Sequence, residues 1–475
     1  MTLKDVDIES TIKKVRQLLE EEKALSPALK SMIEMLILIV TLLVNRLGLD
    51  SRNSSKPPST DPNRKRTSKK KKNKKAGGQP GHNGSTLEKV EKPDKIKTLH
   101  IDKRALPRGN QYHEVGFESR QVIDFEISTI VTEYRAQILE DENGKKYVAP
   151  FPENVTRPVQ YGANLKANSV YMSQFQLIPY KRIQDHFNDQ MNISISAGTL
   201  FNINKQAYDS LERFDEIAIN KLARSALLHA DETGINVGGK RIWLHSASNE
   251  LWTYFHPHPK RGTEAMNAIG ILPTFNGILC HDHWKPYFKY SCTHALCNAH
   301  HLRELERAWE QDKQAWAKQM KALLEEMNNS VHDAGGQLSA ADAKRYRNKY
   351  KALLCKAEIE CPPPDETKRV NKRGRMKRSK ARNLLERLID YEQDVLRFME
   401  TKIVPFTNNQ GENDIRMTKV QQKISGCFRS MDGAYIFCRI RSYLSTCRKN
   451  GMNPSEALKL LFAGKLPDFI VESAE

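Results

Sequence analysis

The sequence predicts an α/β protein with a large helical insertion, and three observations support this prediction. Residues 225–290 alternate short apolar runs with polar turns, in the order three strands, a helix and a fourth strand. Residues 294–328 and 338–400 show helical periodicity, interrupted by three prolines at 362–364. The chain has 475 residues, which is too long for one ordinary domain and indicates roughly two to four folded units.

Residues 1–50 are predicted to be a helical segment. Their apolar residues recur at the 3-4 spacing of a coiled coil, with an interruption at Pro27. We expect a helical hairpin or short coiled coil that joins copies of the chain, or else an amphipathic helix packed on its own core. The apolar positions are Ile12, Val15, Leu19, Leu29, Ile33, Leu36, Val40, Leu43 and Leu47.

The positive charge of the chain is concentrated in two tracts. Lysine and arginine number 76 against 57 acidic residues, which gives a formal net charge of +19. Nine of the twelve residues 64–75 and nine of the fifteen residues 368–382 are basic, and neither tract contains an acid. The rest of the chain is therefore close to neutral. Clustered basic side chains neutralise phosphates and release counterions, so nucleic acid is the expected partner; the alternative is a solubilising tail.

Within these tracts, a set of lysines and arginines is predicted to contact the DNA backbone. They are Arg64, Lys65, Arg66, Lys69, Lys70, Lys71, Lys72, Lys74, Lys75, Arg373, Arg375, Lys377 and Arg378.

The region between the N-terminal helices and the α/β domain divides into three predicted parts. Residues 51–96 are a basic flexible linker, because their Pro, Gly, Ser and Lys content cannot bury enough surface to offset chain entropy. Residues 97–158 are a small β unit without cysteine, with a strand over 122–138 and an Asn-Gly turn at 143–144 before a return strand. Residues 159–224 are helical and connect or bind DNA, either as a helix-turn-helix or as an ordinary packed helix pair.

Composition also disfavours some classes of protein. The longest apolar run, Met35–Val44, has ten residues, fewer than the roughly 20 that span a bilayer. The N-terminus lacks the form of a signal peptide. All eight cysteines lie at or after Cys280, which fits a reducing cytosol better than a disulfide framework. We therefore expect a cytoplasmic, nucleoid-associated protein with no membrane partner.

Two aspartates follow short apolar strands in the α/β region. Asp231 and Asp282 each stand where such a strand is expected to end, so neighbouring strands would bring the carboxylates together. Glu412, near the start of a later helix, is the candidate third acid, and Arg416 and Lys419 share its helical face, where they can meet phosphate. Oxygen ligands of this kind bind Mg²⁺ or Mn²⁺. The alternative is that each acid is only a turn or cap residue.

A second metal hypothesis concerns a cluster of cysteines and histidines. Cys292, His294, Cys297, His300 and His301 fall within ten residues, and the Cys297-x-x-His300 spacing suits a structural zinc. The competing interpretation is an amphipathic helix that packs beside the carboxylates. On that interpretation His300 or Arg303 contacts DNA.

Four sequence blocks resemble the core motifs of bacterial transposases of the insertion-sequence-sixty-six family. They are HADETG at 229–234, DHWKPY at 282–287, LCNAHHLREL at 296–305 and NNQGEN at 408–413. NSSKPPS at 53–59 and GGQPGH at 77–82 resemble the linker of that family, so the resemblance runs in order over most of the chain.

The resemblance implies a ribonuclease-H-like catalytic domain with an Asp-Asp-Glu triad. Carried over by position, the domain comprises residues 225–291 and 401–445, with a helical insertion at 292–400 and a C-terminal helical segment at 446–475. The triad is Asp231, Asp282 and Glu412, which would bind two Mg²⁺ or Mn²⁺ ions. The Glu-x₆-Lys spacing to Lys419 is similar to that of other transposases of this class.

The chain also departs from the family pattern. The tyrosine and arginine that precede the glutamate in some transposases of this class are replaced near Thr407 and Asn408. Relatives usually carry a cysteine zinc module after the linker, whereas residues 97–150 contain no cysteine. We therefore expect no structural zinc in the β unit.

The expected function is that of a DNA transposase that binds transposon ends, cleaves DNA and joins the freed 3′-hydroxyl to target DNA. The expected assembly is a homodimer or higher oligomer at synapsis, with accessory proteins of the same element as further partners. The alternatives are an inactive, transposase-derived DNA-binding regulator, a nuclease without strand transfer, and an interaction protein built on a structural zinc.

Overall fold

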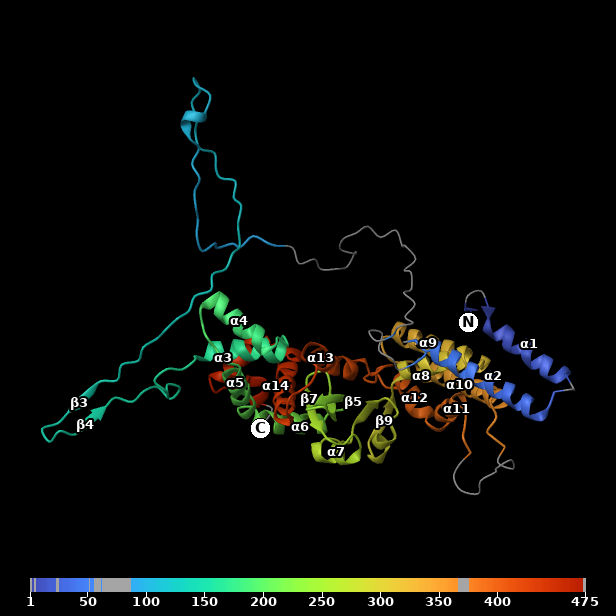
Figure 1. The fold of residues 1–475 in the computed structure, drawn as a ribbon. Coiled ribbons are helices and arrows are strands. Elements are labelled where there is room, and N and C mark those ends of the chain that lie inside the picture. Colours follow the sequence, from blue (N-terminus) through green and yellow to red (C-terminus); the bar gives the residue numbers. More distant parts are fainter. Residues whose placement is uncertain are drawn as a thin grey trace. The chain divides into compact units, whose positions relative to one another are not determined.

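The computed structural model describes residues 2–3, 6–22, 25–50, 52–54, 61, 87–365 and 376–472. The chain divides into two compact units, Lys65–Ala149 and the remainder, Met1–Arg64 with Pro150–Glu475. Figure 1 shows the elements of both units in chain order. The larger unit contains all three candidate acids, so the site is a property of that unit alone.

Two helices open the larger unit, after the two-residue strands β1 (Thr2–Leu3) and β2 (Val6–Asp7). They are α1 (Ile8–Glu21) and α2 (Pro27–Leu47), and Pro27 begins the second helix as its preference for the first turn predicts. Nε2 of Gln311 donates to the carbonyl of Asn45 at 3.2 Å, and Nδ2 of Asn53 donates to Glu310 at 2.6 Å. These bonds attach the end of α2 to the helical insertion.

The side chains of α2 are largely exposed and apolar. Among the described residues, α2 is the helix that is long and apolar enough, by length and composition, to cross a membrane. Counting only the run Met35–Val44, which Thr41 interrupts, understated this helix, because Leu29, Ile33 and Leu47 extend its apolar surface beyond the run. Association of two copies through α1 and α2 stays a prediction.

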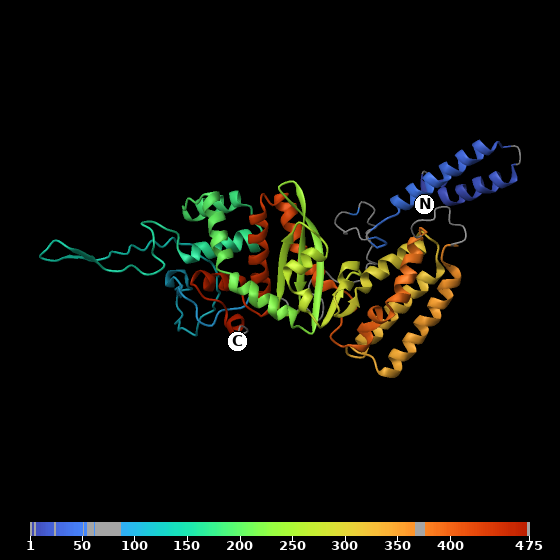
Figure 2. The same cartoon turned by 90° about the horizontal axis from the view of Figure 1, so that it is seen from below.

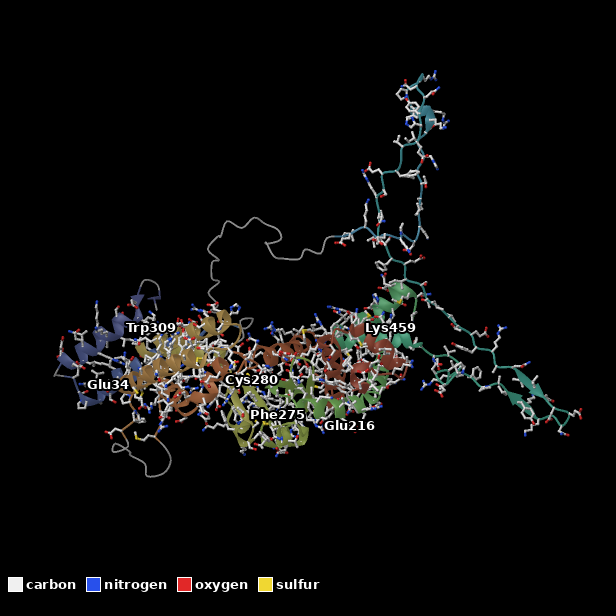
Figure 3. The ribbon with its side chains drawn as sticks, turned by 180° about the vertical axis from the view of Figure 1, so that it is seen from behind. Glu34, Glu216, Phe275, Cys280, Trp309 and Lys459 are labelled. Atoms are coloured by element: carbon white, nitrogen blue, oxygen red, sulfur yellow. The ribbon has the colours of Figure 1, made fainter. Side chains whose placement is uncertain are left out.

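The smaller unit has far less regular structure than the sequence predicted. Among the residues of this unit that the structure describes, strand pairing is confined to β3 (Ile138–Glu140) and β4 (Lys146–Val148), which form an antiparallel hairpin around Gly144. The turn at 143–144 is confirmed, but the strand predicted over 122–138 is wrong except at Ile138. Its apolar side chains have no core to enter: Val122 is 93% exposed. In Figure 3 side chains of this unit project singly, whereas Phe275 and Cys280 lie in a crowded core.

Residues 159–224 are helical, as expected. The helices are α3 (Ala163–Val170), which continues through a wider turn at Tyr171–Phe175, α4 (Tyr180–Met191), α5 (Ala197–Asp209) and α6 (Glu212–Ala223). Ser196 caps α5 by accepting a hydrogen bond from the backbone of Thr199 at 3.0 Å. Phe187, Leu200, Leu211 and Phe214 are fully buried with the sheet residues in one core.

A five-stranded mixed sheet lies at the centre of the larger unit. Its strands are β5 (Leu227–Val237), β6 (Lys240–Ser248), β7 (Thr253–His258), β8 (Ile278–His281) and β9 (Thr293–Leu296), in the order β7-β6-β5-β8-β9. β6 pairs antiparallel with both β5 and β7, whereas β8 and β9 run parallel to β5. An α/β domain is therefore confirmed.

Two details of the sheet differ from the prediction. The strand expected to end at Asp231 continues to Val237, because β6 pairs with it over its full length from His229. The short strand β9 falls where the helical insertion was expected to begin; its four residues carry too little periodicity to be distinguished from a helix.

Each face of the sheet packs against a different set of helices. Leu228 and Ala230 enter the core with α7 (Thr263–Ile269) and α3 to α6. Ile235 and Leu244 enter a second core with α13 (Asn409–Ser425) and α14 (Met431–Lys449). The backbone amides of Thr253 and Phe255 donate to Thr446 and Ser442, so α14 also covers the free edge of β7. Figure 2 shows α14 beside this end of the sheet.

The helical insertion forms a bundle with its own core. It comprises α8 (Asn298–Glu310), α9 (Ala315–Asp333), α10 (Ala340–Glu360), α11 (Lys380–Asp390) and α12 (Glu392–Glu400). Trp316, Tyr350 and Leu388 are fully buried in it, together with Ala295 and Leu296 of β9. The bundle is therefore continuous with the β9 edge of the sheet. After α14, the helices α15 (Pro454–Phe462) and α16 (Asp468–Val471) close the chain.

Candidate functional site

Asp231 lies on the central strand of the sheet. It pairs with Ser246 of β6, two residues beyond the last pair that β5 makes with β8, His229 with Cys280. Because successive strand residues point to opposite faces, Asp231 faces α13 while Ala230 enters the opposite core. The pairing of β5 with β8 ends at His229, so Asp231 lies just beyond it, near the carboxyl end of the neighbouring strand.

Asp282 follows β8 directly, so it stands at the same end of the sheet as Asp231. Its Oδ1 accepts a hydrogen bond from the backbone of Trp284 at 2.9 Å. The intervening His283 has a left-handed backbone, with φ of 72°, a conformation that costs energy for a residue with a side chain. This tight turn keeps the Asp282 carboxyl at the strand end.

Glu412 lies in the first turn of α13, the helix that packs against β5 and β6. Its Oε1 is 3.6 Å from a terminal nitrogen of Arg303 and 4.0 Å from Nδ1 of His300, both on α8. Oε1 of Glu412 and Nδ1 of His300 are both buried without a hydrogen-bond partner among the described residues. Leaving such a group unpaired costs about 1–3 kcal/mol.

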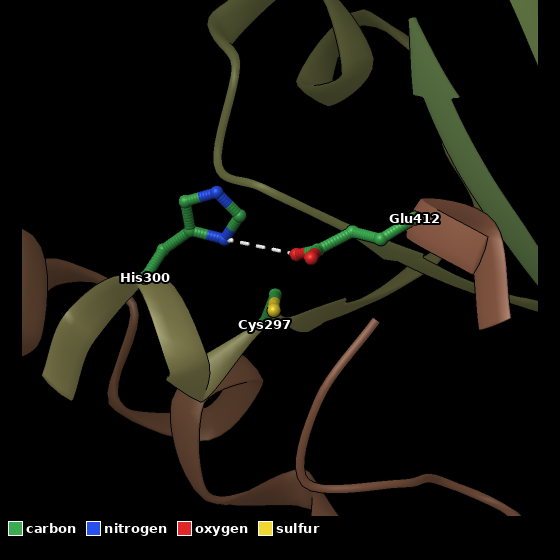
Figure 4. Close-up of side chains that lie close together, drawn as sticks. All are labelled: Cys297, His300 and Glu412. Carbon is green, nitrogen blue, oxygen red and sulfur yellow. Dashed lines mark ion pairs between the residues drawn. The ribbon is translucent and has the colours of Figure 1, made fainter. Parts of the chain in front are cut away.

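The charges of Asp282 and Glu412 act on the carboxyl group of Asp231. Burial, followed by the charges of Glu232, Asp282 and Glu412, raises the pKa of Asp231 to about 8. The structure therefore brings the predicted acids into one electrostatic neighbourhood, although their side chains do not meet at ligand spacing. The described residues offer one group of at least three ligand atoms within 4.8 Å of one another, formed by Cys297, His300 and Glu412. Figure 4 shows this group.

Asn408, at the start of α13, is a residue whose role the sequence did not reveal. Its side chain is buried; Nδ2 donates to the carbonyl of Ala230 at 2.9 Å, and Oδ1 lies 2.7 Å from Nδ1 of His229. Its backbone amide donates to Sγ of Cys297 at 3.1 Å. Asn408 thus connects the strand that carries Asp231 with the helix that carries Glu412. The sequence feature that could have indicated this role is the position of Asn408 within the NNQGEN block.

Glu232 is a second acid that the prediction did not single out. Its side chain is 1% exposed and lies on the opposite face from Asp231, where the Tyr287 hydroxyl donates to it at 2.6 Å and Arg261 at 2.8 Å. The guanidinium of Arg261 lies 4.1 Å from the ring centre of Trp284. Burial, followed by Asp282, raises the pKa of Glu232. Through these contacts Glu232 holds β5 against Tyr287 and Arg261.

The cysteines and histidines between 292 and 301 do not form one zinc cluster. Cys292 is buried in the core, His294 pairs with His281 at 3.1 Å, and His301 pairs with Asn298 at 3.0 Å. Only Cys297 and His300 come together, as their spacing indicated, and the third member is Glu412 rather than a nearby cysteine. The five-residue zinc cluster is therefore wrong, whereas the Cys297-x-x-His300 pairing is retained.

The sequence model of the Transposase IS66 family matches residues 158–436, more than half of the chain. The chain belongs to the IS66 transposase family. A family of unknown function (DUF6444) matches residues 5–88, and no protein with a curated description matches the chain.

Family membership confirms the resemblance that the four blocks indicated. A transposase role follows, with DNA as partner, a nucleotidyl-transfer or nuclease activity and use of a divalent metal. The matched range contains the whole sheet, the insertion and all three acids. The site of this transposase family member therefore falls within the part of the chain that the family shares.

Of the basic residues predicted to contact DNA, some are exposed and others bond to the protein itself. Arg416 is exposed on α13, whereas Nζ of Lys419 donates to the carbonyl of Gly234 at 3.0 Å, so the lysine holds α13 to β5. Burial, followed by Arg241, lowers the pKa of Lys419. Lys377 is exposed, and Arg378 pairs with Glu386. The residues 64–75, and with them Arg373 and Arg375, lie outside the described residues.

Proposed function

We propose that this IS66-family transposase cleaves the ends of its element and joins the freed 3′-hydroxyl to target DNA, with Asp231, Asp282 and Glu412 as the metal-binding triad. The observation that carries the proposal is the convergence of three acids from distant parts of the sequence. They come from β5, the end of β8 and the first turn of α13. Burial, followed by the charges of Glu232, Asp282 and Glu412, raises the pKa of Asp231 to about 8.

The topology supports a ribonuclease-H-like domain for this chemistry. Three antiparallel strands are followed by two parallel ones, and the strand bearing the first acid is central. The second acid follows the adjacent parallel strand, and the third lies on a helix that packs against the central strand after the insertion. This is the arrangement that the family resemblance implies.

The chemistry of the donor atoms fits divalent cations. Asp231, Asp282 and Glu412 offer hard oxygen ligands, which suit Mg²⁺ or Mn²⁺, and Oε1 of Glu412 is a buried acceptor with no hydrogen-bond partner in the described part of the chain. When bound between such carboxylates, a pair of divalent ions activates the attacking oxygen and stabilises the leaving oxygen of an in-line phosphoryl transfer.

The other residues of the site position these acids or meet DNA. Asn408 fixes the start of α13 against β5, and Lys419 fixes the same helix about three turns later. Arg416 is free to approach a phosphate on the exposed side of α13. Arg303 lies 3.6 Å from Glu412 and directs this carboxylate.

The two basic tracts are proposed to bind DNA with little sequence preference, and the helices of residues 159–224 to contribute to recognition of the ends. Synapsis of two ends requires at least a dimer, which the exposed apolar side chains of α2 can supply. A cytoplasmic location and accessory proteins of the same element are part of this proposal.

The test is a cleavage and joining assay with purified full-length protein, Mg²⁺ and DNA that carries the terminal repeats of the element. We expect cleavage at the repeat ends and covalent joining to a second DNA. Cleavage without joining would support the nuclease alternative. Binding without either reaction would support the inactive regulator.

A metal-dependent change of stability provides a test that needs no DNA. Between pH of about 4 and about 8 the folded chain keeps a proton on Asp231 that the unfolded chain has lost, so the stability of the metal-free protein falls as pH rises. We expect Mg²⁺ to raise the melting temperature more at the upper end of this range, because fewer protons compete for the carboxylate.

Asp231→Asn removes the titrating group, so its metal-free form should melt above the wild type at the alkaline end and gain less from Mg²⁺. Glu216→Gln is the matched control, because Glu216 is exposed on α6. An equal Mg²⁺ effect in all three proteins, measured by scanning calorimetry, would contradict the assignment.

A further inference from the structure

Glu412 belongs to the proposed triad with Asp231 and Asp282, but in this structure its carboxylate lies beside Cys297 and His300. Sγ of Cys297, Nδ1 of His300 and an oxygen of Glu412 all lie within 4.8 Å of one another. Figure 4 shows the Glu412 carboxylate directed towards the imidazole, with the Cys297 sulfur beside both. The two aspartates of the proposed triad do not belong to this group.

Two polar atoms of this group lack hydrogen-bond partners among the described residues. Nδ1 of His300 and Oε1 of Glu412 are buried and make no hydrogen bond to any described residue. They are 4.0 Å apart, too far for a direct hydrogen bond. Arg303, at 3.6 Å from Oε1, offsets charge but is also beyond hydrogen-bond distance. A cation between these atoms would satisfy both.

The elements that carry the three side chains hold them in place. Cys297 immediately precedes α8 and His300 lies three residues later, so both occupy one face of the first turn. The backbone amide of Asn408 donates to Sγ of Cys297 at 3.1 Å, the kind of surrounding hydrogen bond that orients a metal ligand. Glu412 follows on α13, four residues after Asn408.

The donor set selects a different metal from that of the triad. A thiolate and an imidazole are softer ligands than carboxylates and favour Zn²⁺ over Mg²⁺. Ligand atoms around a tetrahedral zinc are separated by about 3.5 Å, given Zn–S and Zn–N bonds of about 2.3 and 2.0 Å. Atoms already within 4.8 Å need only small side-chain adjustments to reach that spacing.

We propose that Cys297, His300 and Glu412 form a second, inhibitory metal site that takes Zn²⁺ or another thiophilic divalent cation. The inhibition rests on the proposed function, because it requires Glu412 to be a member of the catalytic triad. A carboxylate bound to zinc between Cys297 and His300 is withdrawn from Asp231 and Asp282. The site has three protein ligands and leaves a fourth position for solvent, so the ion can exchange.

Cobalt binding tests the site without DNA or activity. Metal-free, full-length protein is titrated with Co²⁺, and the thiolate-to-cobalt absorption in the near ultraviolet is recorded. We expect about one equivalent to bind with this absorption. The absorption should vanish in Cys297→Ser and persist in Cys355→Ser, which removes an exposed thiol outside the group.

His300→Ala provides a second variant if Cys297→Ser does not fold, and it should weaken Co²⁺ binding at least tenfold. Absence of the thiolate absorption in the wild type, or its persistence in Cys297→Ser, would overturn the site.

Inhibition is measured in the Mg²⁺-dependent cleavage assay with added Zn²⁺. We expect the Zn²⁺ concentration for half inhibition to rise at least tenfold in Cys297→Ser and to stay unchanged in Cys355→Ser. Equal zinc sensitivity of all three proteins would overturn the inhibitory role. Complete lack of cleavage in zinc-free wild type would count against the transposase proposal, whereas the cobalt titration would still decide on the metal site.

Discussion

Replacing Asp231 with asparagine is expected to lower cleavage and joining by about a thousandfold or more, with little change in DNA binding. The side chain lies on the central strand, faces α13 and has its pKa raised by burial and by Glu232, Asp282 and Glu412. Asparagine keeps the size but loses the charge that holds a divalent ion. Metal stabilisation of the transferring phosphate contributes several kcal/mol, and each 1.4 kcal/mol is about tenfold in rate.

The measurement compares single-turnover cleavage of end DNA with the dissociation constant of the same DNA. Glu216→Gln again serves as the control, because it removes one exposed carboxylate from the same unit. We expect control rates within about twofold of wild type. An Asp231→Asn protein that still joined DNA at a rate near wild type would show that the triad assignment is wrong.

The part of the site that the sequence predicted depends on strong local patterns. The apolar runs that begin β5 and form β8 are visible in the sequence, and an acid follows each of them, Asp231 within β5 and Asp282 just after β8. Glu412 was placed on a helix because the residues before it suit a helix start. The antiparallel pairing of β6 with β7 likewise follows from the short polar turn between two apolar runs.

Other features depend on contacts that local patterns do not contain. β9 has four residues and is defined by its parallel pairing with β8. Residues 122–137 have β-forming side chains, yet no partner strand lies beside them among the described residues, so the propensity alone did not produce a strand. The contact of Glu412 with Cys297 and His300 joins positions more than a hundred residues apart, and no spacing rule predicts it.

Asn408 is the strongest example, because its side chain and its backbone amide together connect three segments that are distant in sequence: β5, the start of α8 and the start of α13. Its Nδ2 donates to Ala230, so its Oδ1 must accept from Nδ1 of the buried His229. A methyl group at Gly411 would lie 3.1 Å from the Asn408 amide, which shows how closely the first turn of α13 packs around it. The position of Glu412 therefore follows from that of Asn408.

Asn408→Ala is expected to lower cleavage by about a hundredfold, because a shift of about 1 Å in a catalytic group has an effect of this size. It should also destabilise the protein by about 1–3 kcal/mol for each buried partner left unpaired, the Ala230 carbonyl and the His229 ring. Asn409→Ala is the matched control, since Asn409 is the adjacent amide and is exposed.

The Mg²⁺ concentration at half-maximal cleavage separates positioning from mere loss of stability. A displaced Glu412 binds the ion less well, so this concentration should rise several-fold in Asn408→Ala. It should not rise in Leu444→Ala, which creates a cavity in the core away from the acids and destabilises the fold by a comparable or larger amount. If both variants kept the wild-type Mg²⁺ dependence, Asn408 would support the fold without positioning Glu412.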